Sequence, residues 1–371
     1  MKIGIITDAI DDNAGGIQTY VRSLVENIFQ IDKKNKYYLI HHKKSSDSIY
    51  KNRKEILIPL KRFPFYREIR KVILMPFILR KYRLDLVHET AQIGPFFLPS
   101  NFKKIITIHD LVPLIYPETH SLLTWIHHRI GLQLILNKVD KIIAVSNSTK
   151  RDILKFFNIP ENKITVIQEG HFDYYKPIND KAVLNKIKKK YNLTFKFILF
   201  VGTLEPRKNI CRVIQALVNV RKEFPELKLV ITGKKGWKYK EVFRLINKLK
   251  LNENIIFTGY VPEEDLPVLN NLAELLVYPS LYEGFGLSPL GAMKCGCPVV
   301  SSNTSSIPEV VGDAGILVNP FSIKGIAEGI LNILKNDKYK SQLIKKGLSQ
   351  SRLFNWKRFT HQTIELYKET I

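Results

Sequence analysis

The chain has 371 residues, 45% of them hydrophobic, and carries a formal net charge of +24. This length and apolar content are sufficient for two hydrophobic cores. Its three cysteines, Cys211, Cys295 and Cys297, exclude a disulfide framework, and the C-x-C pair lacks the spacing and partners of a zinc site. A reducing cytoplasm is therefore the expected compartment.

The positive charge raises the question of a polyanionic partner. Nucleic acid and anionic membranes are the usual partners of such a surface, and a composition biased towards Lys, Ile and Asn is the alternative explanation. No uninterrupted apolar segment is long enough to span a bilayer, and the apolar run after Met1 reaches Asp8 too early for a signal peptide. The positions at which basic residues cluster therefore say more about a possible partner than the net charge does.

Short apolar runs alternate with helical patterns through the first half of the chain. The first run, Lys2–Thr7, is followed by Gly15 and Gly16 and then by a helix with an apolar face. These glycines would place backbone amides beside a ligand, although a simple tight turn explains them equally well. The repeated strand–helix order predicts a parallel sheet covered on both faces. Further strands are expected at Tyr37–His41, Leu84–His88, Ile105–His109, Ile142–Val145 and Ile164–Ile167.

The segment Lys61–Arg83 is strongly basic. Lysine and arginine surround its apolar run Val72–Leu79, and Glu68 is its single acidic residue. A basic amphipathic segment of this kind predicts a helix on a membrane surface, kinked or interrupted at Pro76. A core-packed helix with a solvated basic face fits the pattern equally well. The residues predicted to contact an anionic membrane are Arg67, Arg70, Lys71, Arg80 and Lys81.

A second strand–helix series occupies the rest of the chain. Phe172–Pro177 and the lysine-rich Lys181–Tyr191 are expected to connect the two halves, and Trp356–Glu369 is expected to form a final amphipathic helix. Strands are expected at Phe195–Val201, Leu227–Thr232, Ile255–Thr258, Leu275–Tyr278, Val299–Ser301 and Ile316–Val318. The two series together predict an α/β protein with two parallel sheets.

The stretch Leu281–Val318 contains the most specific chemical pattern. Glu283 follows the apolar strand Leu275–Tyr278, at the edge of the sheet where open α/β folds bind ligands. Gly286 allows the backbone to approach a ligand, and the amides of Gly286 and Leu287 at a helix start suit a phosphate. A carboxylate beside an anion-binding turn indicates a ligand with both hydroxyl groups and phosphates, such as a nucleotide sugar.

Two further turns supply the other groups that a sugar transfer needs. Arg207 and Lys208, in the turn after the strand Phe195–Val201, would neutralise a leaving diphosphate. His109 ends the strand that begins at Ile105 and is expected to face the ligand. A structural histidine near the core is the alternative for His109.

These motifs resemble those of the retaining glycosyltransferases of family 4. The resemblance covers nearly the whole chain and is strongest over Val201–Asn209 and Leu281–Gly315. It implies an α/β fold in the GT-B arrangement, with two Rossmann-like domains, parallel sheets and an interdomain cleft. The implied domains are residues 1–176 on the acceptor side, residues 177–354 around the nucleotide sugar, and residues 355–371 as a helix that crosses back to the first domain.

The resemblance also implies roles for individual residues. Glu283 would contact the donor sugar, and Arg207 and Lys208 would contact the diphosphate. His109 would border the reaction centre without having to act as a general base. The residues implied on the donor side are Gly15, Gly16, Tyr260, Val261, Phe285, Gly286, Leu287, Gly291 and Glu309.

Two positions depart from the family pattern. Thr203 stands where the family commonly has an arginine, and Arg207 would compensate for it. Gly291 stands where the family has a second glutamate, which bonds the ribose hydroxyls of the donor. Either the site is otherwise intact and Gly291→Glu would tighten nucleotide binding, or close packing of the helix requires a small residue.

The resemblance therefore implies an enzyme, a retaining glycosyltransferase that moves a hexose from a nucleotide diphosphate sugar to a glycan or lipid-linked glycan during polysaccharide assembly. The His-Asp-Leu-Val-Pro and Glu-Pro-Arg-Lys-Asn forms of its motifs resemble mannosyltransferases, which makes GDP-mannose the first donor to consider. The alternative is a catalytically silent relative that serves as a binding or scaffolding subunit.

The expected partners are a nucleotide-sugar donor, a glycan or lipid-linked acceptor and an anionic membrane surface, but not nucleic acid. No cofactor is expected, because the nucleotide sugar is a co-substrate. No Asp-x-Asp follows a strand, so no diphosphate-bound metal ion is predicted. The expected location is the cytoplasm, with a peripheral position on the inner face of the cell membrane as a hypothesis.

Overall fold

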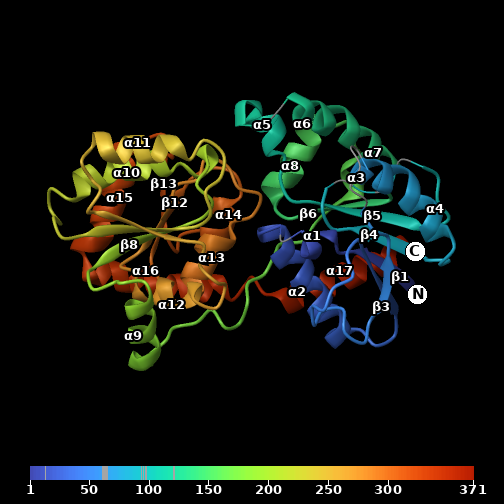
Figure 1. The fold of residues 1–371 in the computed structure, drawn as a ribbon, viewed down its shortest axis with the longest axis horizontal. Helices are drawn as coiled ribbons and strands as arrows, with labels where there is room; N and C mark the ends of the chain where they lie inside the picture. Colours follow the sequence, from blue (N-terminus) through green and yellow to red (C-terminus); the bar gives the residue numbers. More distant parts are fainter. Residues whose placement is uncertain (13, 61–65, 93, 95, 97, 120–121) are drawn as a thin grey trace. The chain divides into compact units, whose positions relative to one another are not determined.

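The computed structural model describes residues 1–371 except residues 13, 61–65, 93, 95, 97 and 120–121. Contacts among the described residues divide the chain into two units (Figure 1). Unit 1 comprises Met1–Gly170 and Trp356–Ile371, and unit 2 comprises His171–Asn355. The chain leaves unit 1 after residue 170, where the sequence predicted 176, and returns to it after residue 355, where the sequence predicted 354.

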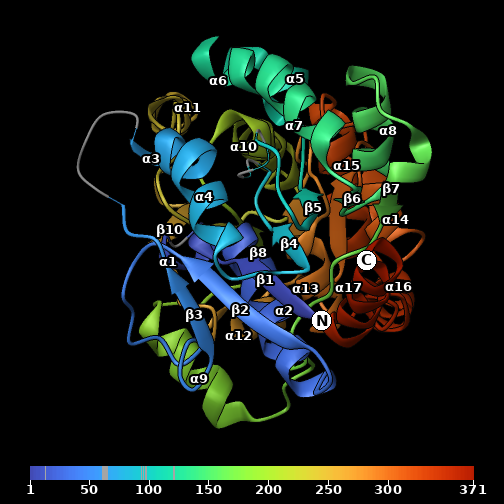
Figure 2. The same cartoon turned by 90° about the vertical axis from the view of Figure 1, so that its right-hand side faces the viewer.

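The described part of unit 1 is built on a sheet of seven parallel strands (Figure 2). Their spatial order is β3-β2-β1-β4-β5-β6-β7, so the order reverses beside β1. The strands are β1 (Lys2–Ile6), β2 (Lys36–His41), β3 (Lys54–Leu57), β4 (Leu86–Glu89), β5 (Lys103–Ile108), β6 (Lys141–Ala144) and β7 (Ile164–Val166). The predicted parallel sheet is confirmed. The short edge strand β3 was not predicted, because it contains one buried residue, Ile56, and no apolar run.

Helices cover both faces of this sheet. The helices are α1 (Asp8–Asp11), α2 (Gly16–Ile31), α3 (Tyr66–Ile69), α4 (Met75–Arg80), α5 (Val112–Ile115), α6 (Leu122–Ile126), α7 (Leu132–Lys138), α8 (Asn147–Phe156) and α17 (Trp356–Thr370), with the π-helical segments η1 (Arg70–Leu74) and η3 (His127–Gly131) and the short 3₁₀ turns η2 (Pro117–Thr119) and η4 (Glu161–Lys163). Helices α4, α7 and α8 share one hydrophobic core with strand residues such as Val87 and Ile106. Helices α2 and α17 pack against each other, and Figure 1 shows the red α17 beside the blue N-terminal elements.

A buried polar chain holds α17 on the opposite face of the sheet from that core. The Tyr367 hydroxyl lies 2.6 Å from His88 Nδ1, and His88 Nε2 lies 2.8 Å from the Thr107 hydroxyl, which also contacts the Tyr20 hydroxyl at 2.9 Å. His88 and Thr107 alternate along their strands with Val87 and with residues that flank Thr107 in the core, so they point to the other face. Burial lowers the pKa of His88 to about 3, and the ring is therefore neutral.

The basic segment forms a helical stretch with one irregular turn beside Pro76. Segments α3, η1 and α4 follow one another, and Pro76 lies in the first turn of α4, directly after the wider π turn of η1. Pro76 therefore does not end the helix, but the regular α-helical geometry is interrupted next to it. Arg70 is buried: its guanidinium donates to the Asp8 carboxylate at 2.6 and 3.0 Å and to the carbonyl of Ile58 at 2.6 Å. Arg70 therefore belongs to the interior and is not available to a membrane, which corrects the prediction for this residue.

The other basic residues of the segment differ in exposure. Lys71 is largely buried, with its Nζ 3.6 Å from Glu89 Oε2, whereas Arg80 and Lys81 are exposed. The side chain of Arg67 lies outside the described part of the chain. Within the part of the chain that is described, no helix combines the length and the apolar character needed to cross a membrane.

Unit 2 repeats the architecture with six parallel strands in the order β10-β9-β8-β11-β12-β13. The strands are β8 (Phe197–Val201), β9 (Lys228–Thr232), β10 (Ile255–Gly259), β11 (Leu276–Tyr278), β12 (Val299–Ser302) and β13 (Ile316–Val318). The helices are α9 (Lys181–Lys190), α10 (Ile210–Val220), α11 (Lys240–Lys248), α12 (Leu266–Leu272), α13 (Leu287–Lys294), α14 (Ile307–Val311), α15 (Ile323–Lys335) and α16 (Asp337–Ser351), with the 3₁₀ turn η5 (Pro206–Lys208). A second hydrophobic core, including Leu229, Val277 and Ile330, fills this unit. The predicted α/β class with two parallel sheets is confirmed.

Candidate active site

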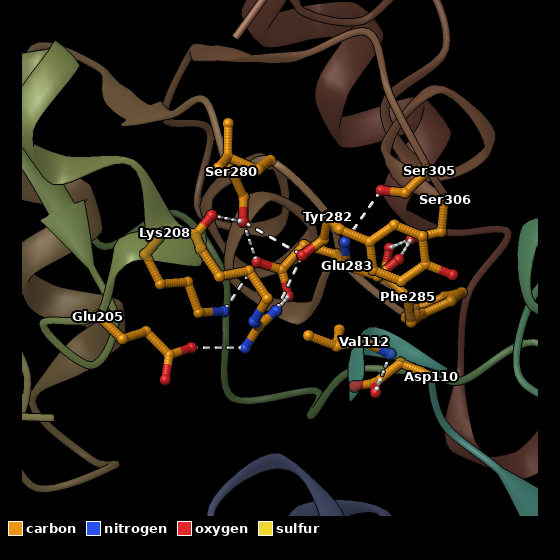
Figure 3. A network of polar contacts seen from close by, with 12 residues as sticks. Asp110, Val112, Glu205, Lys208, Ser280, Tyr282, Glu283, Phe285, Ser305 and Ser306 are labelled. Carbon is orange, nitrogen blue, oxygen red and sulfur yellow. Dashed lines mark hydrogen bonds and ion pairs between the residues drawn. The ribbon is translucent and has the colours of Figure 1, made fainter. Parts of the chain in front are cut away.

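Glu283 is the centre of a hydrogen-bonded cluster in unit 2 (Figure 3). It lies in the turn between β11 and α13, after the carboxyl end of a buried strand. Its Oε1 atom accepts hydrogen bonds from Lys208 Nζ at 2.8 Å, from the Tyr278 hydroxyl at 2.8 Å and from the Ser280 hydroxyl at 2.5 Å. Its Oε2 atom accepts a hydrogen bond from Arg207 Nη1 at 2.9 Å. A buried carboxylate is thus surrounded by two cations and two hydroxyl groups.

The neighbouring charges keep Glu283 ionised. Burial by itself would raise the pKa of the carboxyl group, but Arg207 and Lys208 lower it to about 2. Burial also lowers the pKa of the Lys208 ammonium, and Glu283 opposes that shift. Because the folded pKa of Glu283 lies below its ordinary value of 4.5, its ionisation contributes roughly 3 kcal/mol to stability above that pH. This contribution is lost as the pH falls towards about 2.

Arg207 and Lys208 reach the carboxylate from the turn between β8 and α10. Lys208 ends η5, and the next residue, Asn209, adopts a left-handed conformation with φ 62°. The buried Asn209 amide donates to the carbonyls of Pro279 at 2.9 Å and Pro320 at 2.6 Å, which ties this turn to the turn that carries Glu283. Two motifs that the sequence predicted separately therefore meet in one cluster.

The Glu283 cluster can accept a further hydrogen bond from a ligand. Within the described chain, Arg207 is the one donor to Glu283 Oε2, and an ionised carboxylate oxygen accepts about two hydrogen bonds. A ligand hydroxyl can therefore bind Oε2 without displacing Lys208. Arg207 also pairs with Glu205 at 2.7 Å and keeps part of its surface exposed, so it can turn towards an anionic ligand.

The start of α13 provides the backbone groups of the site. Gly286 precedes the helix with φ 127°, and a Cβ atom there would lie 2.9 Å from Ile307 Cδ1. The Ser306 hydroxyl hydrogen-bonds to the carbonyls of Glu283 at 2.9 Å and Phe285 at 2.5 Å and fixes the turn. Phosphate binding by the amides of Gly286 and Leu287 stays a prediction that this geometry permits.

His109 lies in unit 1, directly after β5. Its Nε2 donates to the carbonyl of Thr90 at 2.8 Å, and its Nδ1 lies 3.4 Å from Glu169 Oε1. Burial would lower the pKa of His109, but Glu169 outweighs this effect and raises the pKa above its usual value. Both ring nitrogens are engaged, so neither is available as a general base in this arrangement. That His109 borders the reaction centre without acting as a general base stays a prediction.

Three side chains in these two clusters were not predicted from the sequence: Tyr278, Ser280 and Glu169. Ser280 and Glu169 follow closely after β11 and β7. Their positions offered a usable signal, because polar residues at the carboxyl ends of parallel strands gather at one edge of the sheet. Tyr278 ends the buried strand β11 and so stands at the same edge, but its buried aromatic ring looks like an ordinary core residue.

Comparison with protein families covers most of the chain. The model described as Glycosyltransferase Family 4 matches residues 14–171, and the model described as Glycosyl transferases group 1 matches residues 184–350. The O-antigen chain mannosyltransferase B of Escherichia coli is 33% identical over 388 aligned residues, which cover 99% of this chain and 100% of the relative. The chain belongs to glycosyltransferase family 4.

A longer relative of this glycosyltransferase is the serotype-specific mannosyltransferase WbdA of Escherichia coli. It is 31% identical over 71% of this chain, and the match covers only 33% of WbdA. Among solved structures, HepE of Anabaena in complex with UDP and glucose has a TM-score of 0.81 at 18% identity, over 100% of both chains. Sucrose-phosphate synthase from Thermosynechococcus elongatus has a TM-score of 0.79 at 21% identity, over 100% of this chain and 98% of that one. These likenesses confirm the predicted GT-B fold of the glycosyltransferase.

The remaining donor-side residues of the glycosyltransferase lie at turns. Tyr260 and Val261 follow β10, with Tyr260 exposed and Val261 buried, and Glu309 lies in the first turn of α14. Phe285 is buried, and its ring centroid lies 5.7 Å from that of Phe354. In unit 1, Gly15 precedes α2 with φ 58° and Gly16 is the first residue of that helix. Their contacts with a nucleotide sugar stay predictions.

The Thr203 methyl group packs on the backbone of Gly236, where a Cβ atom would lie 2.5 Å from it. In the described ranges of the chain, no three or more His, Cys, Asp or Glu side chains are grouped to hold a metal ion.

Gly291 is tightly packed in α13. A Cβ atom at this position would lie 2.7 Å from His171 Nε2 and 3.0 Å from Tyr175 Cε1. Both rings are held in place, because Phe172 N donates to His171 Nδ1 at 3.0 Å and the Tyr175 hydroxyl donates to Glu263 at 2.7 Å. The structure therefore favours the second interpretation of Gly291, in which close packing requires a small residue, over a vacant position for glutamate.

We expect Gly291→Ala to destabilise the glycosyltransferase by about 1–3 kcal/mol, because overpacking outweighs the better helix propensity of alanine. Urea unfolding measures this change. Gly347→Ala in α16 is the matched control, since its Cβ would meet the flexible Met293 side chain at 3.3 Å. Introducing His171→Ala first should lower the cost of Gly291→Ala, because it removes the nearer of the two contacts and leaves only the one with Tyr175. A stable Gly291→Glu variant with tighter nucleotide binding would instead show that His171 moves aside easily.

Proposed function

We propose that this glycosyltransferase transfers mannose from GDP-mannose to a growing, lipid-linked polysaccharide, with retention of the anomeric configuration and without a metal ion. The similarity to a protein named O-antigen chain mannosyltransferase B, over nearly the full length of both chains, supports the sugar and the pathway class. The Glu283 cluster carries the proposal, because it joins a carboxylate for sugar hydroxyls to two cations for a diphosphate.

Each group has a distinct part in the proposed reaction. Arg207 and Lys208 stabilise the negative charge that grows on the diphosphate as its bond to the sugar breaks. Glu283 Oε2 accepts a hydrogen bond from a sugar hydroxyl and orients the ring. In a retaining transfer the acceptor attacks the face that the diphosphate leaves, and a phosphate oxygen takes the acceptor proton. This route requires no general base, in agreement with the engaged nitrogens of His109.

A donor panel tests the proposal. Nucleotide release is measured with GDP-, UDP-, ADP- and dTDP-sugars in the presence of a mannose-containing acceptor, with and without EDTA. We expect release from GDP-mannose, unchanged by EDTA, and an axial anomeric linkage in the product by NMR. Release from a UDP-sugar alone would replace the donor, loss of activity in EDTA would contradict metal independence, and inversion would contradict the mechanism.

The packed Gly291 keeps a second function open, a catalytically silent binding or scaffolding subunit. The ribose-binding glutamate that the family resemblance implies has no room at this position. Failure to release nucleotide from every donor, together with capture of a required partner enzyme, would favour this second function over the first.

A further inference from the structure

Unit 1 exposes a stripe of large aliphatic side chains on one helical rod. The rod consists of α6, η3 and α7, which follow one another without a break. Four side chains on it are strongly exposed: Leu122 (72%), Ile126 (39%), Ile130 (58%) and Leu134 (48%). Exposure of these apolar surfaces to water is unfavourable, so burial of the stripe against a partner would lower the free energy.

The π-helical segment keeps this stripe straight. In an α-helix of about 3.6 residues per turn, every fourth residue advances by roughly 40° around the axis. A π turn is wider, so every fourth residue there falls short of a full turn. Because the π-helical η3 stands between α6 and α7, its rotation around the helix axis opposes the rotation in the α-helical turns. The four side chains therefore stay on one face, while Leu132, Ile135 and Leu136 face the core.

A second rod on the same side of the sheet has the same design. It consists of α3, η1 and α4, and it exposes Ile69 (36%), Ile73 (45%) and Phe77 (53%) at the same spacing of four residues, again across a π-helical segment. Met75 and Leu79 of this rod share one core with α7, so both rods cover the same face of the seven-stranded sheet. Figure 2 shows both rods, with α3 and α4 in blue and α6 and α7 in teal to green.

The charged residues along both rods are mostly basic. Residues 122–138 contain Arg129 and Lys138 but no acidic residue, and residues 66–83 contain a single one, Glu68. Arg80 lies with its guanidinium 5.4 Å from the centre of the exposed Phe77 ring, and Lys81 follows it. Apolar stripes bordered by exposed cations match the two layers of an anionic bilayer surface, its acyl chains and its phosphate headgroups.

We propose that the two stripes form a lipid-binding surface, on which Leu122, Ile126, Ile130, Leu134, Ile69, Ile73 and Phe77 enter the acyl boundary of an anionic phospholipid bilayer while Arg80, Lys81 and Arg129 contact its phosphates. This inference rests on the proposed function, since a lipid-linked acceptor lies at such a surface. In this proposal the main contacts with the membrane are apolar side chains, and the buried Arg70 and Lys71, which the sequence predicted as contacts, take no part.

A second copy of the chain fits the same surface less well. In a twofold dimer the same patch of both copies meets, so the cations Arg80, Lys81 and Arg129 of one copy would lie in the same interface as those of the other. A bilayer of phosphatidylglycerol instead supplies the opposite charge.

Flotation of the full-length protein with vesicles tests the surface. We expect binding to phosphatidylcholine vesicles that contain phosphatidylglycerol, and weaker binding to phosphatidylcholine alone. The double variant Ile130→Ser, Leu134→Ser should lower the partition coefficient by roughly tenfold or more, because two apolar anchors are lost. Its matched control is Phe321→Ser, Leu353→Ser, two residues of similar exposure in unit 2, which should bind as the parent does.

A charge pair separates specific contacts from general attraction. Arg80→Gln with Lys81→Gln should weaken binding to phosphatidylglycerol vesicles by roughly tenfold or more. Lys188→Gln with Lys189→Gln removes two exposed lysines of α9 in unit 2 and should have little effect. Equal losses from both pairs would overturn the proposal, because the binding would then reflect net charge alone.

Two further outcomes have separate meanings. Nucleotide release from GDP-mannose with a water-soluble acceptor, but no vesicle binding, would overturn the lipid surface and leave the proposed function standing. Vesicle binding that depends on the stripes, without activity on any donor, would do the reverse. Sedimentation without lipid completes the test: a dimer that Ile130→Ser, Leu134→Ser dissociates, with no binding to vesicles, would assign the face to self-association instead.

Discussion

We expect the replacement of Glu283 by glutamine to lower the rate of sugar transfer by about a hundredfold or more. The amide keeps the shape of the side chain but removes the negative charge that holds Arg207 and Lys208 in place. It also offers a donor where Oε1 accepts hydrogen bonds from three groups. Nucleotide release and product formation, measured at saturating donor, report the loss. Lys208→Ala should cause a loss of similar size.

Glu205→Gln is the matched control for this experiment. Glu205 also pairs with Arg207, but it lies at a more exposed position, and its backbone carbonyl, which accepts a hydrogen bond from Lys208 N, is unchanged in the glutamine variant. We expect a much smaller loss from it. Thermal unfolding of each variant separates chemistry from folding, since Glu283→Gln leaves two cations without their carboxylate in a buried place. Near-normal turnover in a folded Glu283→Gln variant would rule out the mechanism.

We expect Arg70→Met to destabilise the protein by about 3–5 kcal/mol, because it leaves the carboxylate of Asp8 without its cation in a nearly buried position. The lost hydrogen bond from Arg70 to the Ile58 carbonyl adds to this cost. Chemical denaturation with urea gives the change in the free energy of unfolding. Addition of Asp8→Asn to the variant should recover part of the loss, since the unpaired charge is then gone.

The control for Arg70 is its neighbour Arg80, which lies on the same helical rod but is exposed. Arg80→Met should change the free energy of unfolding by less than about 0.5 kcal/mol. If both substitutions had the same small effect, Arg70 would be a surface residue and the buried pair with Asp8 would not exist in solution.

The sequence predicted the fold class from local patterns. Apolar runs that alternate with amphipathic stretches give parallel strands covered by helices, and twelve of the thirteen strands in the described part of the chain were anticipated with small shifts at their ends. The exception, β3, is a short edge strand whose pairing with β2 stabilises it more than its own composition does. Such a strand has no local signal, because its hydrogen bonds come from a neighbour.

The candidate site was predictable in its motifs but not in its contacts. Glu283, Arg207 and Lys208 stand in turns after strands, where chemistry gathers in α/β folds, so each could be found alone. Their joint cluster depends on the adjacency of β8 and β11 in the sheet, which no local pattern states. His109 and Glu169 meet for a similar reason, since their strands β5 and β7 lie on either side of β6.

What the sequence by itself determined is therefore the class of fold, the family and the residue types of the site, because periodicity and motif spacing depend on neighbours along the chain. Only the tertiary structure decided that Arg70 is interior, that His171 and Tyr175 close the space over Gly291, and that the exposed faces of two helical rods are apolar. Each of these depends on which distant segment packs against the residue. The sequence pattern of a basic residue in an amphipathic segment is the same whether the residue contacts water or a buried carboxylate such as that of Asp8. The packing of distant segments determines which of the two occurs.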